Sequence, residues 1–434
     1  MQLRAGCAQT CITPDLGVSL AGYFHDRIAR SVRDDLFARV VLLESDGVVL
    51  AIVSLDLAHV HRRVTEPAKA HIAERLGIPV QNIMICATHT HTGPEICEGE
   101  PVAPCEELVE RLPTLICDTV EQAWETRFAA QLRPGRTEVH GYAFNRLFRT
   151  RQGGEVFGRH ENDQVVGRAG GIDPELLMLG VFDERGQLRA LVYNFALHVD
   201  VIGGGTADFI SADWPGEVAR NLGRLYGDDL VALLLQGAAG DINHVSHVPT
   251  SLPTGGPEKA VQLGRALAGA VVYAAERAEP IDDTRLAARQ EVLSIPYFTR
   301  DEEFSRYMQS LKQCQDPGYF ERYLISVADS WQHDGQTADV LVQVMCVGEM
   351  GLVALPAEIF YRIGRELKHY SPFERTLIVE QANDRSSVYI PPERQAQRGA
   401  YGTIPILSRW LSADAGRRVA DAAIRMLHEL YSIS

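Results

Sequence analysis

The sequence predicts a mixed α/β fold in which a β-sheet core is flanked by helices. Apolar, often β-branched runs of strand length alternate with longer segments of helical period. The first of these stretches follows the order strand, helix, strand with short connections, which is typical of a βαβ unit. At 434 residues, the chain is long enough to bury a large core and to form a cleft without disulfide support.

The individual elements follow from the same patterns. Strands are expected over residues 47–60 and 82–87, and the helical pattern between them runs from Val64 to Leu76 and stops at Gly77. A helix is then expected over 106–128, followed by a hairpin of strands over 176–182 and 188–196. Helices are expected over 214–225 and 258–278, with a strand over 230–235 between them. The last expected elements are a pair of strands over 340–347 and 352–355, a helix after Pro356, a strand over 376–380 and a closing helix over 408–430. We find no internal repeat and no linker, so the sequence predicts one domain over residues 1–434.

The charge balance disfavours some classes of partner. Lys and Arg total 42 and Asp and Glu total 57, for a net charge of −15, and no basic stripe is visible. Such a chain repels phosphate backbones, so we expect no nucleic-acid binding. No apolar run approaches the roughly 20 residues of a membrane span, so we expect no stable membrane insertion.

Residues 1–22 do not read as a signal peptide, which favours a cytoplasmic location and reduced thiols for the eight scattered cysteines. The oligomeric state is not indicated.

The strongest local signal is the segment Ala87–Pro94, in which His89 and His91 stand two residues apart just after a buried strand. If the extended backbone continued, both imidazoles would point to the same side. His is a common metal ligand. Taken alone, the pair is equally compatible with two structural loop histidines.

Two further strands end in residues that suit a ligand site. His198 closes the apolar run that begins at Tyr193, and the strand 233–235 breaks into the small-residue segment Gln236–Asn243. Ligand sites gather where strands of an α/β sheet meet their loops, and small residues let the backbone approach a ligand closely. The glycines of Gln236–Asn243 could equally serve only a tight turn.

Five segments together resemble the neutral or alkaline non-lysosomal ceramidases, a family of zinc-dependent amidases. The segments, in chain order, are His89-Thr90-His91-Thr92-Gly93-Pro94, which is similar to the family's HTHSGP signature, Asn194–His198, Gln236–Asn243, Leu355–Phe360, and Tyr389-Ile390-Pro391 with Tyr401 twelve residues beyond Tyr389. The resemblance implies the mixed α/β fold of the ceramidase catalytic domain. It covers most of the chain, without the family's C-terminal immunoglobulin-like domain, and so implies a single zinc-hydrolase catalytic domain over 1–434.

The resemblance also implies roles for individual residues. His89, His198, Glu358 and Tyr389 would bind Zn²⁺, a donor set that suits this ion. His91 would be the acid/base residue and Tyr401 would donate to the oxyanion. Arg146, Asp213 and Asn243 would lie at the substrate, although a solvated arginine and a helix cap are alternatives for Arg146 and Asp213. Asp56 and Asp241 are candidates for holding the second N–H of a ligand histidine.

The expected function is hydrolysis of the amide bond of a small N-acyl compound by metal-activated water. Glu95-Ile96 and Asn243-His244 place charge or bulk where the family keeps other residues, which favours a soluble substrate over a long-chain ceramide. Two alternatives remain at this point. The same metal site could hydrolyse an ester, lactone or sugar-linked bond, or the chain could be a non-catalytic zinc-dependent binding protein.

Overall fold

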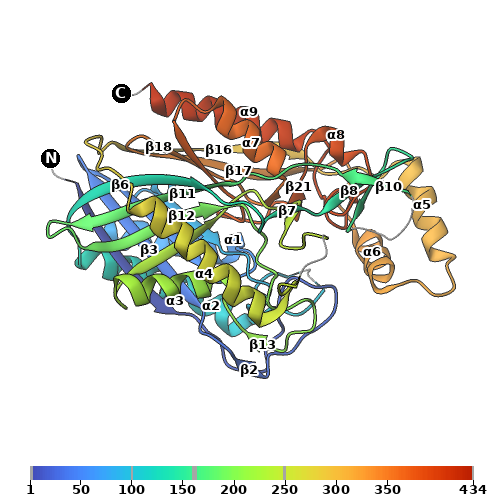
Figure 1. The fold of residues 1–434 in the computed structure, drawn as a ribbon. Coiled ribbons are helices and arrows are strands. Elements are labelled where there is room, and N and C mark those ends of the chain that lie inside the picture. Colours follow the sequence, from blue (N-terminus) through green and yellow to red (C-terminus); the bar gives the residue numbers. More distant parts are fainter. Residues whose placement is uncertain (1–2, 99–100, 159–163, 248–250, 433–434) are drawn as a thin grey trace.

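The fold repeats one order of elements, three strands followed by a helix, a strand and a helix. A computed structural model describes residues 3–98, 101–158, 164–247 and 251–432 (Figure 1). The first occurrence consists of β1 (Arg4–Cys11), β2 (Ser31–Val32), β3 (Phe37–Ser45), β4 (Val48–Leu55), α1 (Arg62–Leu76), the 3₁₀ turn η1 (Val80–Asn82), β5 (Ile83–Ala87) and α2 (Glu106–Glu125). Here β1, β3, β4 and β5 are the sheet strands, and β2 is an added short strand.

The second and third occurrences carry larger additions. The second consists of β6 (Phe128–Glu138), β7 (Phe144–Asn145), β8 (Leu147–Thr150), β9 (Glu155–Phe157), β10 (Val165–Arg168), β11 (Glu175–Asp183), β12 (Leu188–Phe195), β13 (Phe209–Ile210), α3 (Asp213–Tyr226), β14 (Val231–Gln236), β15 (Ile242–Asn243) and α4 (Gly256–Ala275). The third consists of β16 (Leu286–Pro296), α5 (Glu302–Lys312), α6 (Tyr319–Ser330), β17 (Thr337–Val347), β18 (Met350–Ala354), β19 (Glu358–Ile359), α7 (Tyr361–Tyr370), β20 (Arg375–Val379), β21 (Tyr389–Ile390), α8 (Glu393–Ala396) and α9 (Ala415–Tyr431).

Strand pairing confirms that the three occurrences share one topology. In each, the first three sheet strands pair antiparallel and the third pairs parallel with the fourth, as in β4 with β5, β12 with β14 and β18 with β20. The first two occurrences join into an eight-stranded sheet, in the order β14-β12-β11-β6-β1-β3-β4-β5. The third forms a four-stranded sheet, in the order β16-β17-β18-β20. The mixed α/β prediction is confirmed, and the repeat is a feature that the sequence does not reveal.

The eight-stranded sheet bends where its two halves meet. Strands β1 and β6 pair only through Arg4↔Ala129 and Ala5↔Phe128, and across the bend Ser54 Oγ on β4 donates to Leu234 O on β14 at 2.7 Å. The concave side is filled by an apolar core shared with the four-stranded sheet, for example Ile52 with Leu233 and Leu377. Helices α1 to α4 cover the outer face of the large sheet, and α7 and α9 cover the small one (Figure 1).

Several expected element bounds need correction. The closing helix begins at Ala415 rather than at residue 408, because the backbone around Ser408 is held in a loop by hydrogen bonds to Ile404. Strands β1, β3, β6 and β16 and helices α5 and α6 were not expected. The Asp46-Gly47 turn between β3 and β4 has positive φ at both residues, the conformation of a tight hairpin turn. No helix of the described residues is long and apolar enough to cross a membrane.

Candidate metal centre

The ends of parallel strands bring the predicted ligands together. His89 and His91 follow β5, His198 follows β12, and Glu358 opens β19 just after β18. Strand β19 pairs with β21, and in this register Glu358 is the direct partner of Tyr389. Residues from all three occurrences of the repeat therefore meet at one place, where a βα sheet usually carries its ligand site.

His89 and His91 share the site for a reason other than strand alternation. His89 has a φ of 74°, the left-handed region that a residue with a side chain adopts only where its surroundings impose it. Its backbone N–H donates to Leu57 O at 2.8 Å and that of His91 donates to Val199 O at 3.1 Å. The expected extended backbone is thus wrong, although the expected convergence of the two rings is correct.

The hydrogen bonds of the two rings fix their protons. His89 Nδ1 lies 2.6 Å from Ala58 O, and His91 Nδ1 lies 3.1 Å from Gly22 O. A carbonyl oxygen only accepts, so each Nδ1 carries a proton, and the two Nε2 atoms face each other at 3.3 Å. A side chain at Gly22 would collide with His91, because an added Cβ would lie 2.2 Å from Nδ1. The backbone thus presents two basic nitrogens to one point.

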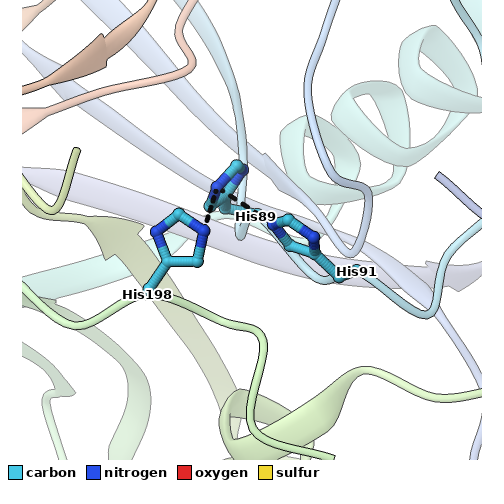
Figure 2. Close-up of side chains that lie close together, drawn as sticks. All are labelled: His89, His91 and His198. Atoms are coloured by element: carbon cyan, nitrogen blue, oxygen red, sulfur yellow. Dashed lines mark hydrogen bonds between the residues drawn. The ribbon is translucent and has the colours of Figure 1, made fainter. Parts of the chain in front are cut away.

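The distances among these nitrogens match the donors around a metal ion. His89 Nε2 lies 3.2 Å from His198 Nε2 and 3.3 Å from His91 Nε2 (Figure 2). Glu358 Oε2 lies 3.5 Å from His89 Nε2 and has no hydrogen-bond donor among the described residues, although it is buried. With Zn–N distances of about 2.0–2.1 Å, the donors of a tetrahedral site lie about 3.3–3.4 Å apart. We call His89, His91, His198 and Glu358 the histidine cluster.

Burial keeps the histidine cluster ready to bind a cation. It lowers the pKa of His91 and of His198 well below the ordinary value, with further lowering from neighbouring positive charge. Both rings are therefore neutral at neutral pH. Neutral imidazoles and a carboxylate oxygen without a hydrogen-bond partner, here Glu358 Oε2, are the form in which these side chains bind a divalent metal.

Tyr389, Tyr401 and Arg146 lie beside the histidine cluster. Arg146 Nη2 donates to Tyr389 Oη at 3.0 Å and lies 3.8 Å from Glu358 Oε2. The rings of Tyr389 and Tyr401 are 5.6 Å apart. Burial, followed by the negative charge of Glu358, raises the pKa of Tyr389 well above its ordinary value, so the phenol keeps its proton. Arg146 orients the two residues that it contacts.

A cavity of about 290 Å³ opens onto this group. It is lined by His89, His91, Glu358, Tyr389 and Tyr401 and by several aromatic residues, namely Tyr23, Phe24, Tyr297, Tyr323, Trp331 and Trp410. Tyr323 and Trp331 belong to the α6 region, which is an addition within the third occurrence of the repeat. The volume is at the small end for sites that enclose a drug-sized ligand.

Three residues, Arg146, Asp213 and Asn243, were expected at the substrate. None of them is among the described residues that line the cavity. Arg146 is buried behind Tyr389 and donates to Gly240 O at 2.6 Å. Asp213 accepts from the backbone N–H groups of Val201 and Ile202 at 2.8 and 3.0 Å and is the first residue of α3 rather than its cap. Asn243 lies in β15 and accepts from Val245 N at 3.0 Å.

Asp56 and Asp241 do not hold ligand histidines. Asp56 Oδ2 forms a buried ion pair with Arg39 at 2.6 Å, and Asp241 accepts from Tyr361 N at 2.8 Å. Backbone carbonyls hold His89 and His91 instead, a role that leaves no signature in a sequence. Both aspartates serve the scaffold.

His59 and Arg385 line the same cavity and form a second polar group with Glu95 and Cys97, of which only Glu95 had been singled out from the sequence. His59 Nε2 lies 2.7 Å from Glu95 Oε1, Arg385 Nη1 lies 2.8 Å from His59 Nδ1, and Cys97 packs within ligand distance of His59 and Glu95. We call these four residues the arginine cluster. His59 follows β4 as His198 follows β12, so knowledge of the repeat would have drawn attention to it.

Comparison with known proteins supports the resemblance. No family model matches the chain. Neutral ceramidase of Pseudomonas aeruginosa is 26% identical over 255 residues, which cover 55% of this chain and 37% of that protein, so the match spans little more than a third of the relative's length. The crystal structure of neutral ceramidase from Pseudomonas aeruginosa matches with a TM-score of 0.77 and 18% identity, over 99% of this chain and 74% of that one. A ceramidase complexed with C2 matches with a TM-score of 0.78 and 18% identity, over 100% and 76% of the two chains.

Proposed function

We propose that this neutral ceramidase-like chain is a zinc-dependent hydrolase that cleaves the amide bond of a small, soluble N-acyl compound. One observation carries the proposal: His89 Nε2, His91 Nε2 and the Oε2 atom of Glu358, which has no hydrogen-bond partner among the described residues, face one another in a buried site. Lone pairs placed about 3.3 Å apart repel unless a cation lies between them. The likeness to proteins named neutral ceramidase supports the choice of an amide.

His89, His198, Glu358 and Tyr389 would hold the zinc. Bound there, the ion would lower the pKa of a water molecule to about 7 and polarise the substrate carbonyl. Glu358 fits this role because its Oε2 is buried without a hydrogen-bond donor. The direct register pairing of Glu358 with Tyr389 puts these two ligands on neighbouring strands.

His91 would move the proton. Its Nδ1–H is held by Gly22 O, and the Nε2 lone pair faces the cluster, so Nε2 is the atom that accepts a proton from the attacking water. As the water oxygen bonds to the carbonyl carbon and the C–N bond breaks, the same nitrogen returns that proton to the leaving amine. A positioned base of this kind contributes about 10²–10⁴ in rate.

Tyr401 would stabilise the negative charge that develops on the carbonyl oxygen. Tyr401 lines the cavity beside Tyr389. The guanidinium carbon Cζ of Arg146 lies 5.2 Å from the centre of the Tyr401 ring. Burial raises the pKa of Tyr401, so the phenol keeps its proton and can donate it in a hydrogen bond. A donor aimed at the oxyanion is worth about 10²-fold or more.

The test is a comparison of the zinc-free and zinc-loaded protein on matched substrates. We expect a short N-acyl amide to be hydrolysed only by the zinc-loaded protein, with release of the free amine, and to be preferred to a long-chain ceramide in detergent. An ester with the same acyl group, run alongside, tests the choice of bond. The proposal is wrong if the zinc-loaded protein hydrolyses no amide, and the soluble substrate class is wrong if kcat/KM is higher for the ceramide.

A further inference from the structure

The loop from Leu20 to Arg27 contacts His91 through three of its residues. Its two ends are joined by Leu20 N, which donates to Arg27 O at 2.8 Å. Gly22 O accepts from His91 Nδ1, and Arg27 Nη2 donates to the backbone carbonyl of His91 at 2.8 Å. The third contact is the ring of Tyr23, whose centre lies 5.7 Å from the centre of the imidazole at an interplanar angle of 80°. The loop thus holds both the backbone and the side chain of His91.

Tyr23 is itself fixed at its hydroxyl and around its ring. Its Oη donates to Asp200 Oδ1 at 2.6 Å. The guanidinium carbon Cζ of Arg27 lies 4.4 Å from the centre of the Tyr23 ring, within the range of a cation–π contact. A Cβ at Gly205 would lie 2.9 Å from Tyr23 Cε1, so the ring fits only because this position is glycine. A tyrosine held at these points has little freedom to move.

The hydrogen bond of His91 to Gly22 leaves one motion of the imidazole open. With Nδ1 bound to Gly22 O, the ring can still tilt about this contact and carry Nε2 away from the histidine cluster. The edge-to-face contact with Tyr23 opposes a tilt toward the loop, because the imidazole would have to enter the space of the phenol ring. Proton transfer requires Nε2 to stay within hydrogen-bond reach of the reacting water, so a displacement of about 1 Å costs rate.

Contact with the substrate is the alternative role for Tyr23, because this residue also lines the cavity. The single hydroxyl hydrogen of Tyr23 is donated to Asp200, so it is not offered to a substrate oxygen. The two roles predict different kinetics. Loss of a substrate contact raises KM, whereas loss of the orientation of His91 lowers kcat.

We propose that Tyr23 is a positioning residue for His91, which keeps the imidazole Nε2 directed at the histidine cluster. Arg27 and Asp200 hold Tyr23 in the orientation that this role requires. The inference rests on the proposed amide hydrolysis and adds to it a residue that acts through His91 alone.

The experiment is a double-mutant cycle of Tyr23→Leu and His91→Ala, measured with the zinc-loaded protein on the short N-acyl amide that the wild type hydrolyses fastest. Tyr23→Leu alone should lower kcat by roughly 10- to 100-fold, with KM within about 3-fold of the wild type and zinc content unchanged. In the His91→Ala background, the same substitution should change kcat by less than about 2-fold, because the residue on which Tyr23 acts is gone.

Two further variants move the ring less drastically. Tyr23→Phe keeps the ring and removes only the hydrogen bond to Asp200, so it should retain most of the rate. Gly205→Ala keeps Tyr23 but places a methyl group against its ring, and should lower kcat in the same direction as Tyr23→Leu.

Tyr226→Leu is the matched control for Tyr23→Leu. Tyr226 also donates to a carboxylate, Glu276 Oε1 at 3.0 Å, but at the ends of the outer helices α3 and α4. This variant should leave kcat, KM and zinc content unchanged.

A second readout needs no hydrolysis. In zinc-free protein labelled with ¹⁵N-histidine, the Nδ1–H signal of His91 is assigned by its absence in His91→Ala. It should be observed in the wild type, Tyr23→Phe and Tyr226→Leu. In Tyr23→Leu it should be broadened by exchange with water, because the imidazole then leaves Gly22 O part of the time.

The outcomes separate the inference from the proposed function. Losses that multiply in the double variant would overturn the inference, since Tyr23 would then act independently of His91. A raised KM with unchanged kcat in Tyr23→Leu would overturn it in favour of a substrate contact. If the wild type hydrolysed no amide, the proposed function would fail, and an unchanged His91 signal in Tyr23→Leu would still overturn the inference.

Discussion

The histidine cluster and the arginine cluster both reach one cavity and both contain histidine and glutamate, but their hydrogen bonds differ. In the arginine cluster the carboxylate meets donors, because Glu95 Oε1 accepts from two backbone N–H groups and lies 2.7 Å from His59 Nε2. In the histidine cluster, three imidazole Nε2 atoms and the Oε2 atom of Glu358, which has no hydrogen-bond partner among the described residues, lie 3.2 to 3.5 Å apart. The comparison teaches that missing donors, rather than residue types, distinguish a metal site from a structural polar network.

The largest effect expected from this comparison is the loss of metal on removal of a ligand. His89→Ala should weaken zinc binding by more than about 100-fold, since replacing even an outer partner of a ligand costs 10- to 100-fold. Amide hydrolysis should fall to background in the same variant. Metal analysis after dialysis checks the binding. Retention of stoichiometric zinc would remove His89 from the ligand set.

The second prediction separates a ligand from a base within the histidine cluster. His91→Ala should keep its zinc and lose about 10²–10⁴ in kcat, because Nε2 would no longer accept the proton. Steady-state kinetics and metal content are measured on the same sample. Because His91 Nε2 lies as close to His89 as His198 does, a variant that loses its zinc would assign His91 as a ligand.

In the arginine cluster, a comparable truncation should affect stability and leave the metal in place. Glu95→Ala removes the carboxylate that anchors His59 and leaves a buried positive group without its partner, at a cost of about 3–5 kcal/mol in the free energy of unfolding. Urea unfolding measures this cost, and zinc content should remain that of the wild type. Loss of zinc together with stability would show that the two clusters are one site.

The pH dependence of stability offers a smaller test of the histidine cluster. Since burial lowers the pKa of His91, the folded zinc-free protein leaves this ring neutral, while the unfolded chain binds a proton below about pH 6.5. The ring therefore lowers stability as the pH falls from 6.5, by about 1 kcal/mol at pH 5.5.

Comparison of the wild type with the His91→Gln variant isolates the contribution of His91 to the pH dependence of stability. Burial raises the pKa of Asp200 and of Asp241 to about 6. These two carboxyl groups raise the stability of the folded protein as the pH falls, which is opposite to the effect of His91. They do so equally in the wild type and in the His91→Gln variant. His91→Gln should accordingly show a dependence that is shallower by about 1 kcal/mol between pH 6.5 and 5.5 in urea unfolding. Identical profiles would mean that His91 is charged in the folded state.

The smallest effect is expected at Cys97. Cys97→Ala removes only the buried sulfur and adds no polar group, so the free energy of unfolding should fall by about 1 kcal/mol, and zinc content should stay constant. A fall in metal stoichiometry on this substitution would indicate that the arginine cluster binds metal.

The sequence predicted the site better than its surroundings. Short signatures at strand ends predicted that His89, His198, Glu358 and Tyr389 share one site, and the structure brings these four residues together. Arg146, expected at the substrate, donates to Tyr389 and is not among the described residues that line the cavity, because sequence does not distinguish an arginine that faces a ligand from one that contacts a neighbouring tyrosine. The backbone carbonyls of Ala58 and Gly22 carry no residue signal at all.

The fold class followed from periodicity, whereas the threefold repeat did not. The occurrences share strand order but not residues, because each needs only apolar faces in the right places. Strand β16 illustrates what periodicity misses, since most of its residues between Leu286 and Ile295 are partly exposed. Its pairing with β17, from a distant part of the chain, holds it in the sheet.

The most direct test is an anomalous difference map of crystals of the zinc-loaded protein, recorded at the zinc absorption edge. The account predicts one peak bounded by His89 Nε2, His198 Nε2 and Glu358 Oε2, and none among His59, Glu95 and Cys97. A peak in the arginine cluster, or none in the histidine cluster, would contradict it.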